Sequence, residues 1–94
     1  MAEPIFKPTT SEAAAGTNVG AASTAGDSEF VRLYNSAAVG TEYLVTVANS
    51  ANATVGTFSL EGGASAIIQK KSDDKVFAAN AAVKFCGAAV YRNW

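Results

Sequence analysis

From residue 30 onward, short runs of alternating hydrophobic and polar side chains follow one another, a pattern typical of β-strands. In the run 42–49, for example, Val45 and Val47 would lie on one face and Leu44 and Thr46 on the other. Runs of this kind predict six strands, at Phe30–Asn35, 42–49, Thr54–Leu60, 64–71, Lys75–Ala78 and Val83–Tyr91.

Turn-forming residues separate the predicted strands. The pair Gly62 and Gly63 is the strongest of these signals, because glycine reaches positive φ without steric cost. No connection is long enough to contain a crossover helix, so the strands should be antiparallel. The pattern therefore predicts an all-β fold, a small antiparallel β-sandwich or barrel of about six strands.

Residues 1–29 differ from the rest of the chain. They are mostly Ala, Gly, Ser and Thr, and they show no hydrophobic periodicity beyond the pair Ile5 and Phe6. Ordering the backbone costs about 1–2 kcal/mol per residue, whereas burying Ile5 or Phe6 returns only about 2–3 kcal/mol. The sequence therefore predicts an extended N-terminal arm at 1–29 and a β-sandwich domain at 30–94. We expect that domain to stay folded when the arm is deleted.

Composition limits the classes of partner. The chain has 94 residues, enough for one domain, and 49% of them are hydrophobic against 16% charged, a composition that favours folding. The net charge of −1 lacks the basic surplus of nucleic-acid-binding proteins. No run approaches the roughly 18 consecutive apolar residues of a membrane span. Neither nucleic acid nor a membrane is expected as a partner.

The sequence offers little catalytic chemistry. It contains no histidine and a single cysteine, Cys86, so Ser-His-Asp and Cys-His catalytic sites and zinc sites built from Cys and His are excluded. Cys86 lies in an apolar run and should be a buried thiol. Lys70 and Lys71 with Asp73 and Asp74 should form an exposed turn with solvated ion pairs, each worth under about 1 kcal/mol. No catalytic, cofactor or metal site is predicted, and we interpret the chain as non-enzymatic.

Both ends of the chain suit contact with another protein. Ile5 and Phe6 would anchor an arm on a neighbouring subunit, although a frayed tail explains them equally well. Tyr91, Arg92 and Trp94 combine residue types that are enriched at binding hot spots. A last strand that closes the sheet, with Trp94 folded over its edge, is an equally good interpretation. These five residues are the predicted partner contacts.

Several motifs resemble those of a known group of proteins. The strand ending in Asn35, the strand containing Gly56, Thr57 and Phe58, and the Lys-Lys-x-x-Asp pattern at 70–74 are similar to segments of small virion proteins of tailed bacteriophages, especially those that infect marine cyanobacteria. The resemblance covers about residues 30–91 and leaves the predicted arm outside. It implies a capsid decoration (cement) protein on the capsid surface of the virion, without active-site residues.

The resemblance also implies partners. A decoration protein would bind the major capsid protein and neighbouring copies of itself, as a possible dimer or trimer, and many weak contacts would strengthen the shell through multivalency. The alternative is a head-fibre, tail or baseplate component, or a receptor- or carbohydrate-binding module. A surface platform of aromatic side chains would favour that alternative, and its candidate members are Tyr34, Tyr43, Tyr91 and Trp94.

Overall fold

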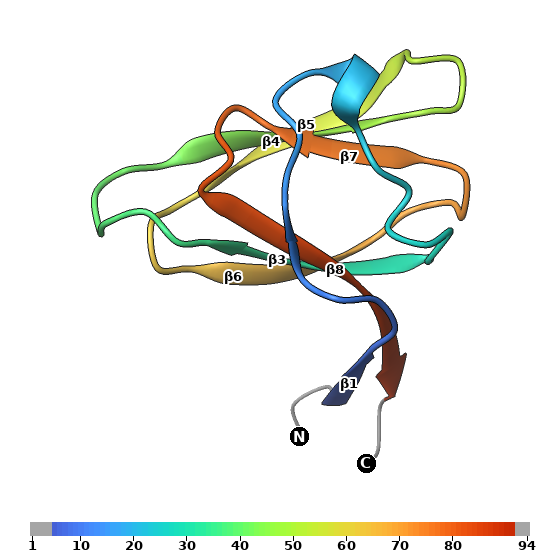
Figure 1. The fold of residues 1–94 in the computed structure, drawn as a ribbon, viewed down its shortest axis with the longest axis horizontal. Helices are drawn as coiled ribbons and strands as arrows, with labels where there is room; N and C mark the ends of the chain where they lie inside the picture. Colours follow the sequence, from blue (N-terminus) through green and yellow to red (C-terminus); the bar gives the residue numbers. More distant parts are fainter. Residues whose placement is uncertain (1–4, 92–94) are drawn as a thin grey trace.

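A computed structural model describes residues 5–91 and contains two antiparallel β-sheets packed face to face (Figure 1). The strands of the larger sheet are β1 (Ile5–Pro8), β2 (Ala13–Ala14), β3 (Phe30–Asn35), β6 (Ser65–Gln69) and β8 (Val83–Tyr91). Their order is β1-β8-β3-β6, and β2 also pairs with β8. The smaller sheet has the order β5-β4-β7, with strands β4 (Tyr43–Ala48), β5 (Thr54–Leu60) and β7 (Lys75–Ala78). The predicted all-β, sandwich-like fold is confirmed.

The predicted strands agree closely with the observed ones. Strands β3, β5, β7 and β8 have the predicted bounds, while β4 and β6 are each shorter than the runs 42–49 and 64–71. Two strands that the sequence did not predict, β1 and β2, lie in the N-terminal segment, together with the 3-10 helix η1 (Val19–Ala21). No helix within the described residues is long and apolar enough to cross a membrane.

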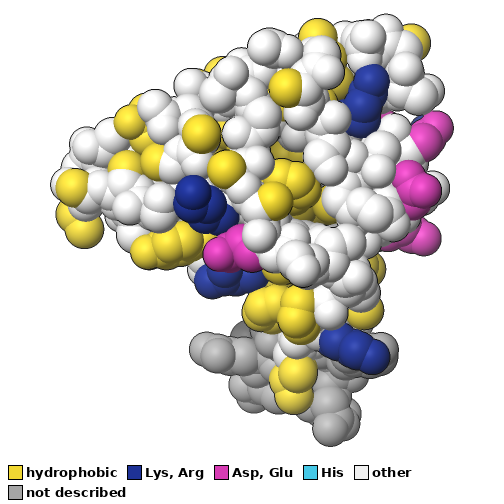
Figure 2. All heavy atoms as spheres, in the orientation of Figure 1, with side chains coloured by type: hydrophobic (Ala, Val, Ile, Leu, Met, Phe, Trp, Pro, Cys, Tyr) yellow, Lys and Arg dark blue, Asp and Glu magenta, His cyan; other side chains and the backbone are white. Residues whose placement is uncertain are grey.

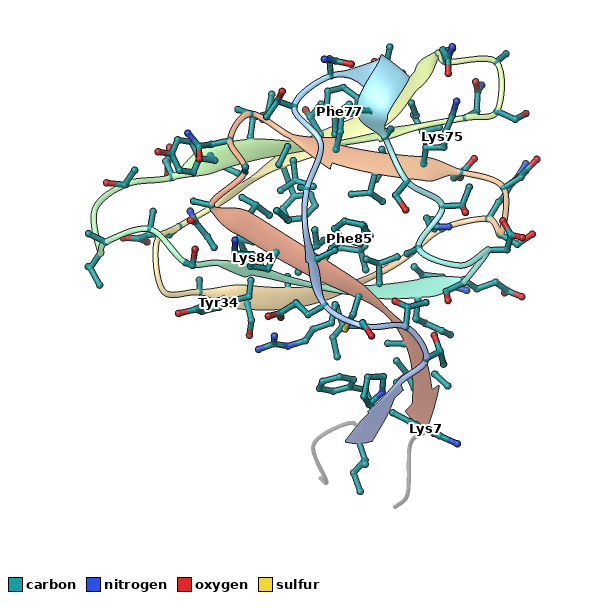
Figure 3. The ribbon with its side chains drawn as sticks, in the orientation of Figure 1. Lys7, Tyr34, Lys75, Phe77, Lys84 and Phe85 are labelled. Carbon is teal, nitrogen blue, oxygen red and sulfur yellow. The ribbon has the colours of Figure 1, made fainter. Side chains whose placement is uncertain are left out.

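The core lies between the two sheets and is formed by alternate residues of the strands. In β3, Val31 and Leu33 are fully buried and point inward. Phe85 of β8 also lies between the sheets, whereas Phe77 lies on the other side of β7, near η1 (Figure 3). Each fully buried large aliphatic side chain contributes about 1.5–3 kcal/mol, so this alternation explains why the two sheets pack together.

One polar residue is fully buried among these hydrophobic side chains. The side-chain amide of Asn35 donates hydrogen bonds to the carbonyl oxygens of Thr41, at 3.0 Å, and Leu60, at 2.7 Å. Its Oδ1 accepts a hydrogen bond from the N–H of Ala37 at 2.9 Å. Asn35 thereby joins the end of β3 to the following loop and to the end of β5.

The predicted extended N-terminal arm is not confirmed. Residues 9–29 run along the side of the sandwich that β8 and β7 form, and their backbone bonds to both sheets (Figure 1). Ala15 N–H donates to Val83 O at 2.8 Å, and Ser23 and Val76 exchange two hydrogen bonds of 3.1 and 2.8 Å. Ala15 and Ala25 are buried in the core. The boundary at residue 29 stays a prediction, which truncation would test.

Small side chains allow this close approach of the N-terminal segment. A Cβ atom at Gly87 of β8 would overlap the carbonyl oxygen of Ala25 and the hydroxyls of Ser28 and Thr9. The segment is held by more than the burial of Ile5 and Phe6. Its backbone forms hydrogen bonds with β8 and β7, which need no large side chain, and these explain why it does not form a free arm.

The N-terminal segment covers two of the four sheet edges. β1 and β2 pair with the outer edge of β8, and Ser23 bridges the outer edge of β7. On the opposite side of the sandwich, β5 and β6 end their sheets, and no other strand among residues 5–91 pairs with their outer edges. The molecule therefore has one closed side and one open side.

Candidate protein-contact surfaces

The first candidate surface is a two-stranded ribbon that extends beyond the sandwich (Figure 1). β3 pairs with β8 only as far as Ala88, so among residues 5–91 the only strand that pairs with residues 89–91 is β1. Ile5 lies opposite Tyr91 in this ribbon and is 62% exposed. A two-stranded ribbon by itself is marginally stable in water, so contact with another surface would stabilise it.

The ribbon brings together predicted contact residues from both ends of the chain. Ile5 and Phe6 lie in β1, and Tyr91 is the last residue of β8. Arg92 and Trp94 lie outside the described residues. In Figure 2, hydrophobic side chains gather where the ribbon leaves the sandwich. No local sequence pattern links the two ends of the chain, and pairing of β1 with β8 places them side by side.

The second candidate surface lies on the outer face of the larger sheet, around Arg32. We call Phe6, Glu12, Arg32 and Tyr34 the Arg32 cluster. The Arg32 guanidinium carbon lies 5.8 Å from the centre of the Phe6 ring and 5.7 Å from that of Tyr34, within the range of cation–π attraction. A guanidinium nitrogen also lies 3.5 Å from a carboxylate oxygen of Glu12. These contacts join the ribbon to the face of the sandwich.

The Arg32 cluster was not predicted from the sequence, although two of its four residues share one face of a predicted strand. Arg32 and Tyr34 are two positions apart in a predicted strand and so share a face, opposite to that of the buried Val31 and Leu33. The positions of Phe6 and Glu12 depend on how residues 5–14 pair with β8, and no local pattern predicts that pairing.

Cys86 lies on the same outer face, opposite Arg32 in the register of β3 and β8. Its side chain is buried, which confirms the prediction of a buried thiol. Burial raises the pKa of the Cys86 thiol, the nearby Glu12 carboxylate raises it further, and the Arg32 guanidinium opposes both. A protonated, covered thiol is a poor nucleophile, so Cys86 contributes packing to this face.

The third candidate surface is a groove on the open side of the sandwich, between the edge strands β5 and β6. Its volume is about 240 Å³. Val47, Val55 and Phe58 of the smaller sheet and Ile68 of the larger sheet supply its apolar lining. Val55 is 60% exposed, and Phe58 is half-buried against the core. The groove is thus an apolar surface that no segment among the described residues covers.

Lys70 and Asp74 line one end of this groove, and the prediction that they are exposed is wrong. Both are buried. The Lys70 ammonium donates to the carbonyl oxygens of Lys71, at 3.1 Å, and Ser72, at 3.3 Å, and Asp74 Oδ2 accepts from the N–H of Lys71 at 3.2 Å. The turn folds around the Lys70 ammonium, whereas Lys71 and Asp73 are exposed as predicted.

Competing effects act on the charge of Lys70. Burial lowers the pKa of its ammonium, and the carboxylates of Asp74, Asp27 and Asp73 oppose that effect. The alternation of residues along a strand does not predict the burial of Lys70. Its burial depends on hydrogen bonds from its ammonium to the carbonyl oxygens of the turn that follows it.

The aromatic platform that would favour the carbohydrate-binding alternative does not form from the two tyrosines whose side chains are described. Tyr34 lies on the outer face of the larger sheet, whereas Tyr43 belongs to the smaller sheet and packs against the core. Within residues 5–91 no three His, Cys, Asp or Glu side chains lie together in a way that could hold a metal ion.

The described residues thus present three surfaces that suit contact with another protein. No protein-family model, curated protein or solved structure matches the chain. The resemblance to bacteriophage virion proteins therefore stays a prediction from the sequence motifs.

Proposed function

We propose that the chain is a capsid decoration (cement) protein, which binds the outer surface of a virion shell and stabilises contacts between major capsid protein subunits. The observation that carries the proposal is the projecting ribbon of β1 and the end of β8. It presents the exposed Ile5 beyond the core, on a structure that gains stability from a partner surface.

The ribbon suits a contact that has low affinity in each copy and gains strength from the number of copies. Burying an exposed isoleucine side chain contributes about 1.5–3 kcal/mol, which is too little for stable binding by itself. A decoration protein is present in many copies on a repeating lattice, and contacts to shell and neighbours add by multivalency. Small apolar contacts from each copy are then sufficient.

The Arg32 cluster supports a second area of contact next to the ribbon. Phe, Tyr and Arg are enriched at the centres of protein interfaces. Phe6 belongs to both surfaces, so they form one continuous area. The Glu12 carboxylate forms an ion pair with Arg32 and so balances its charge. This lowers the desolvation cost of covering the guanidinium with a partner.

The number of copies per particle tests the proposal. Virions of the phage whose genome encodes the chain would be purified, and the chain would be quantified by mass spectrometry against the major capsid protein. Several hundred copies per particle, with density for the chain on the outer shell in electron micrographs, are expected. A few dozen copies or fewer, located on the tail, would support the tail or baseplate alternative, and absence from the virion would refute both proposals.

A further inference from the structure

We propose that two copies of this chain form a dimer by pairing their β5 strands antiparallel, about a two-fold axis at Thr57. The two smaller sheets would then form one continuous sheet of six strands. This inference concerns the free protein and holds whether or not the chain binds a shell. Three features support it: the exposed edge of β5, the residues that the pairing would place opposite each other, and the charges at the two ends of β5.

The β5 edge lacks most of the usual protection of an edge strand. Natural proteins protect such edges with charged side chains, proline, β-bulges or a covering segment, and of these β5 has only a bulge at Val55, near its start. The strand Thr54–Leu60 contains no charged residue and no proline, and its first four residues are all exposed. The chain covers the edges of β8 and β7 with its own N-terminal segment but leaves this one free within the described residues.

A pairing centred on Thr57 places Phe58 of each copy opposite Gly56 of the other. The space around Gly56 is open, since a Cβ atom there would meet no atom within 4 Å. An aromatic ring beside a glycine on a neighbouring strand compensates for the missing side chain. Both residues line the groove, so the pairing would also cover its apolar surface. A bulge at Val55, where the pairing with β4 shifts by one residue, confines the regular contact to residues 56–58 of each copy.

The charges at the two ends of β5 select the antiparallel direction. At the start of the strand, the Lys75 ammonium donates to Asn52 Oδ1. At its end, Glu61 follows Leu60 and is exposed. Antiparallel pairing about Thr57 brings Glu61 of the second copy to the level of residues 52–53, beside Lys75. Parallel pairing would instead place like charges together, so the opposite charges favour a two-fold dimer.

A charge substitution at the axis tests the dimer. Thr57→Lys places two ammonium groups opposite each other across the axis, and Ser65→Lys adds the same charge to the exposed edge strand β6 as a matched control. Sedimentation of the full chain should give twice the monomer mass of 9.6 kDa. We expect Thr57→Lys to raise the dimer Kd at least about ten-fold and Ser65→Lys to leave it unchanged. Circular dichroism would establish that both variants are folded.

Mixing two variants separates a contact at Thr57 from a general effect of charge. Thr57→Lys and Thr57→Glu should each sediment as monomers, and an equimolar mixture should recover the dimer mass. Monomeric wild-type protein at every concentration, a mixture that stays monomeric, or a Ser65→Lys variant that dissociates to the same extent would each overturn the proposal.

A cross-link provides an independent measurement of the register. Residues directly opposite in an antiparallel pair have Cα atoms roughly 4.5–5.5 Å apart, which suits a disulfide. Oxidised Thr57→Cys should run as a covalent dimer, while Ser65→Cys should stay monomeric under the same conditions. The native Cys86 is buried and should not interfere. Equal cross-linking of the two variants would contradict the β5 register.

Discussion

Asn35 is a fully buried polar residue in the interior of the sandwich. Its amide donates to Thr41 O and Leu60 O, so an apolar replacement removes two hydrogen bonds from the interior. We expect Asn35→Ala to lower the free energy of unfolding by about 2–4 kcal/mol in urea titrations. Asn18→Ala, which removes an exposed cap from η1, is the matched control and should cost about 1 kcal/mol or less. Equal losses in the two variants would contradict this role of Asn35.

The two phenylalanines of the core region should differ in their contribution to stability. From the sequence alone, Phe58 would be a core residue whose replacement by alanine costs about 3–5 kcal/mol. In the structure Phe58 is only half-buried and lines the open groove, whereas Phe85 is buried between the sheets. We therefore expect Phe85→Ala to cost about 3–5 kcal/mol and Phe58→Ala about half as much. These values apply at protein concentrations where the chain is monomeric, and a larger loss for Phe58→Ala would show that the groove is closed in solution.

The buried thiol of Cys86 should make stability depend on pH. Its pKa is raised in the folded protein, mainly by burial. Above the ordinary thiol pKa of about 8.5 the unfolded chain loses the proton first, so the free energy of unfolding falls as pH rises. Urea titrations of wild type and Cys86→Ala, from about pH 7 to pH 10, should show wild type losing stability relative to the variant above about pH 8.5. Parallel curves would contradict the raised pKa.

At the scale of strands, the sequence predicted six of the eight from runs of strand-forming residues separated by turns. Alternation of burial is clear in β3 and β7, whereas β4 and β8 have buried residues on both faces. The two that were missed, β1 and β2, are only four and two residues long, and their residues pair with residues of β8 that lie 70 or more positions later in the chain. The candidate surfaces also differ in how much of them the sequence predicts. Ile5 and Phe6 could be proposed from their residue types, whereas the Arg32 cluster and the groove depend on long-range pairing.

Truncation separates the two roles of the N-terminal segment. Deleting residues 1–8 removes the ribbon strand and should leave the sandwich folded with a small loss of stability. Deleting residues 1–29 also removes Ala15, Ala25 and the hydrogen bonds that cover β8 and β7, and we expect it to destabilise the domain by several kcal/mol. Thermal unfolding followed by circular dichroism measures both. A longer truncation as stable as the shorter one would support the boundary predicted from the sequence at residue 29.

At the scale of the whole molecule, the closed side and the open side leave separate surfaces for separate partners. The ribbon projects from one end of the sandwich (Figure 1), whereas β5 is the outer strand of the smaller sheet. A dimer formed through β5 would therefore carry two free ribbons. Two ribbons on one rigid body can bind two shell subunits at once, which links the proposed dimer to the stabilising role of a decoration protein.

Attachment to the shell should then depend on Ile5 and not on exposed hydrophobic residues in general. Ile5→Asp places a charge on the ribbon, and Val39→Asp places the same charge on a loop residue that is 84% exposed and lies outside all three candidate surfaces. Each purified variant would be added to particles from a phage that lacks the gene, and bound protein would be measured after sedimentation of the particles. Because every copy loses its apolar anchor, we expect the apparent affinity of Ile5→Asp to fall at least about ten-fold, while Val39→Asp binds as wild type does. Undiminished binding of Ile5→Asp would exclude the ribbon as the site of attachment, and an equal loss in both variants would indicate binding through unspecific hydrophobic contact.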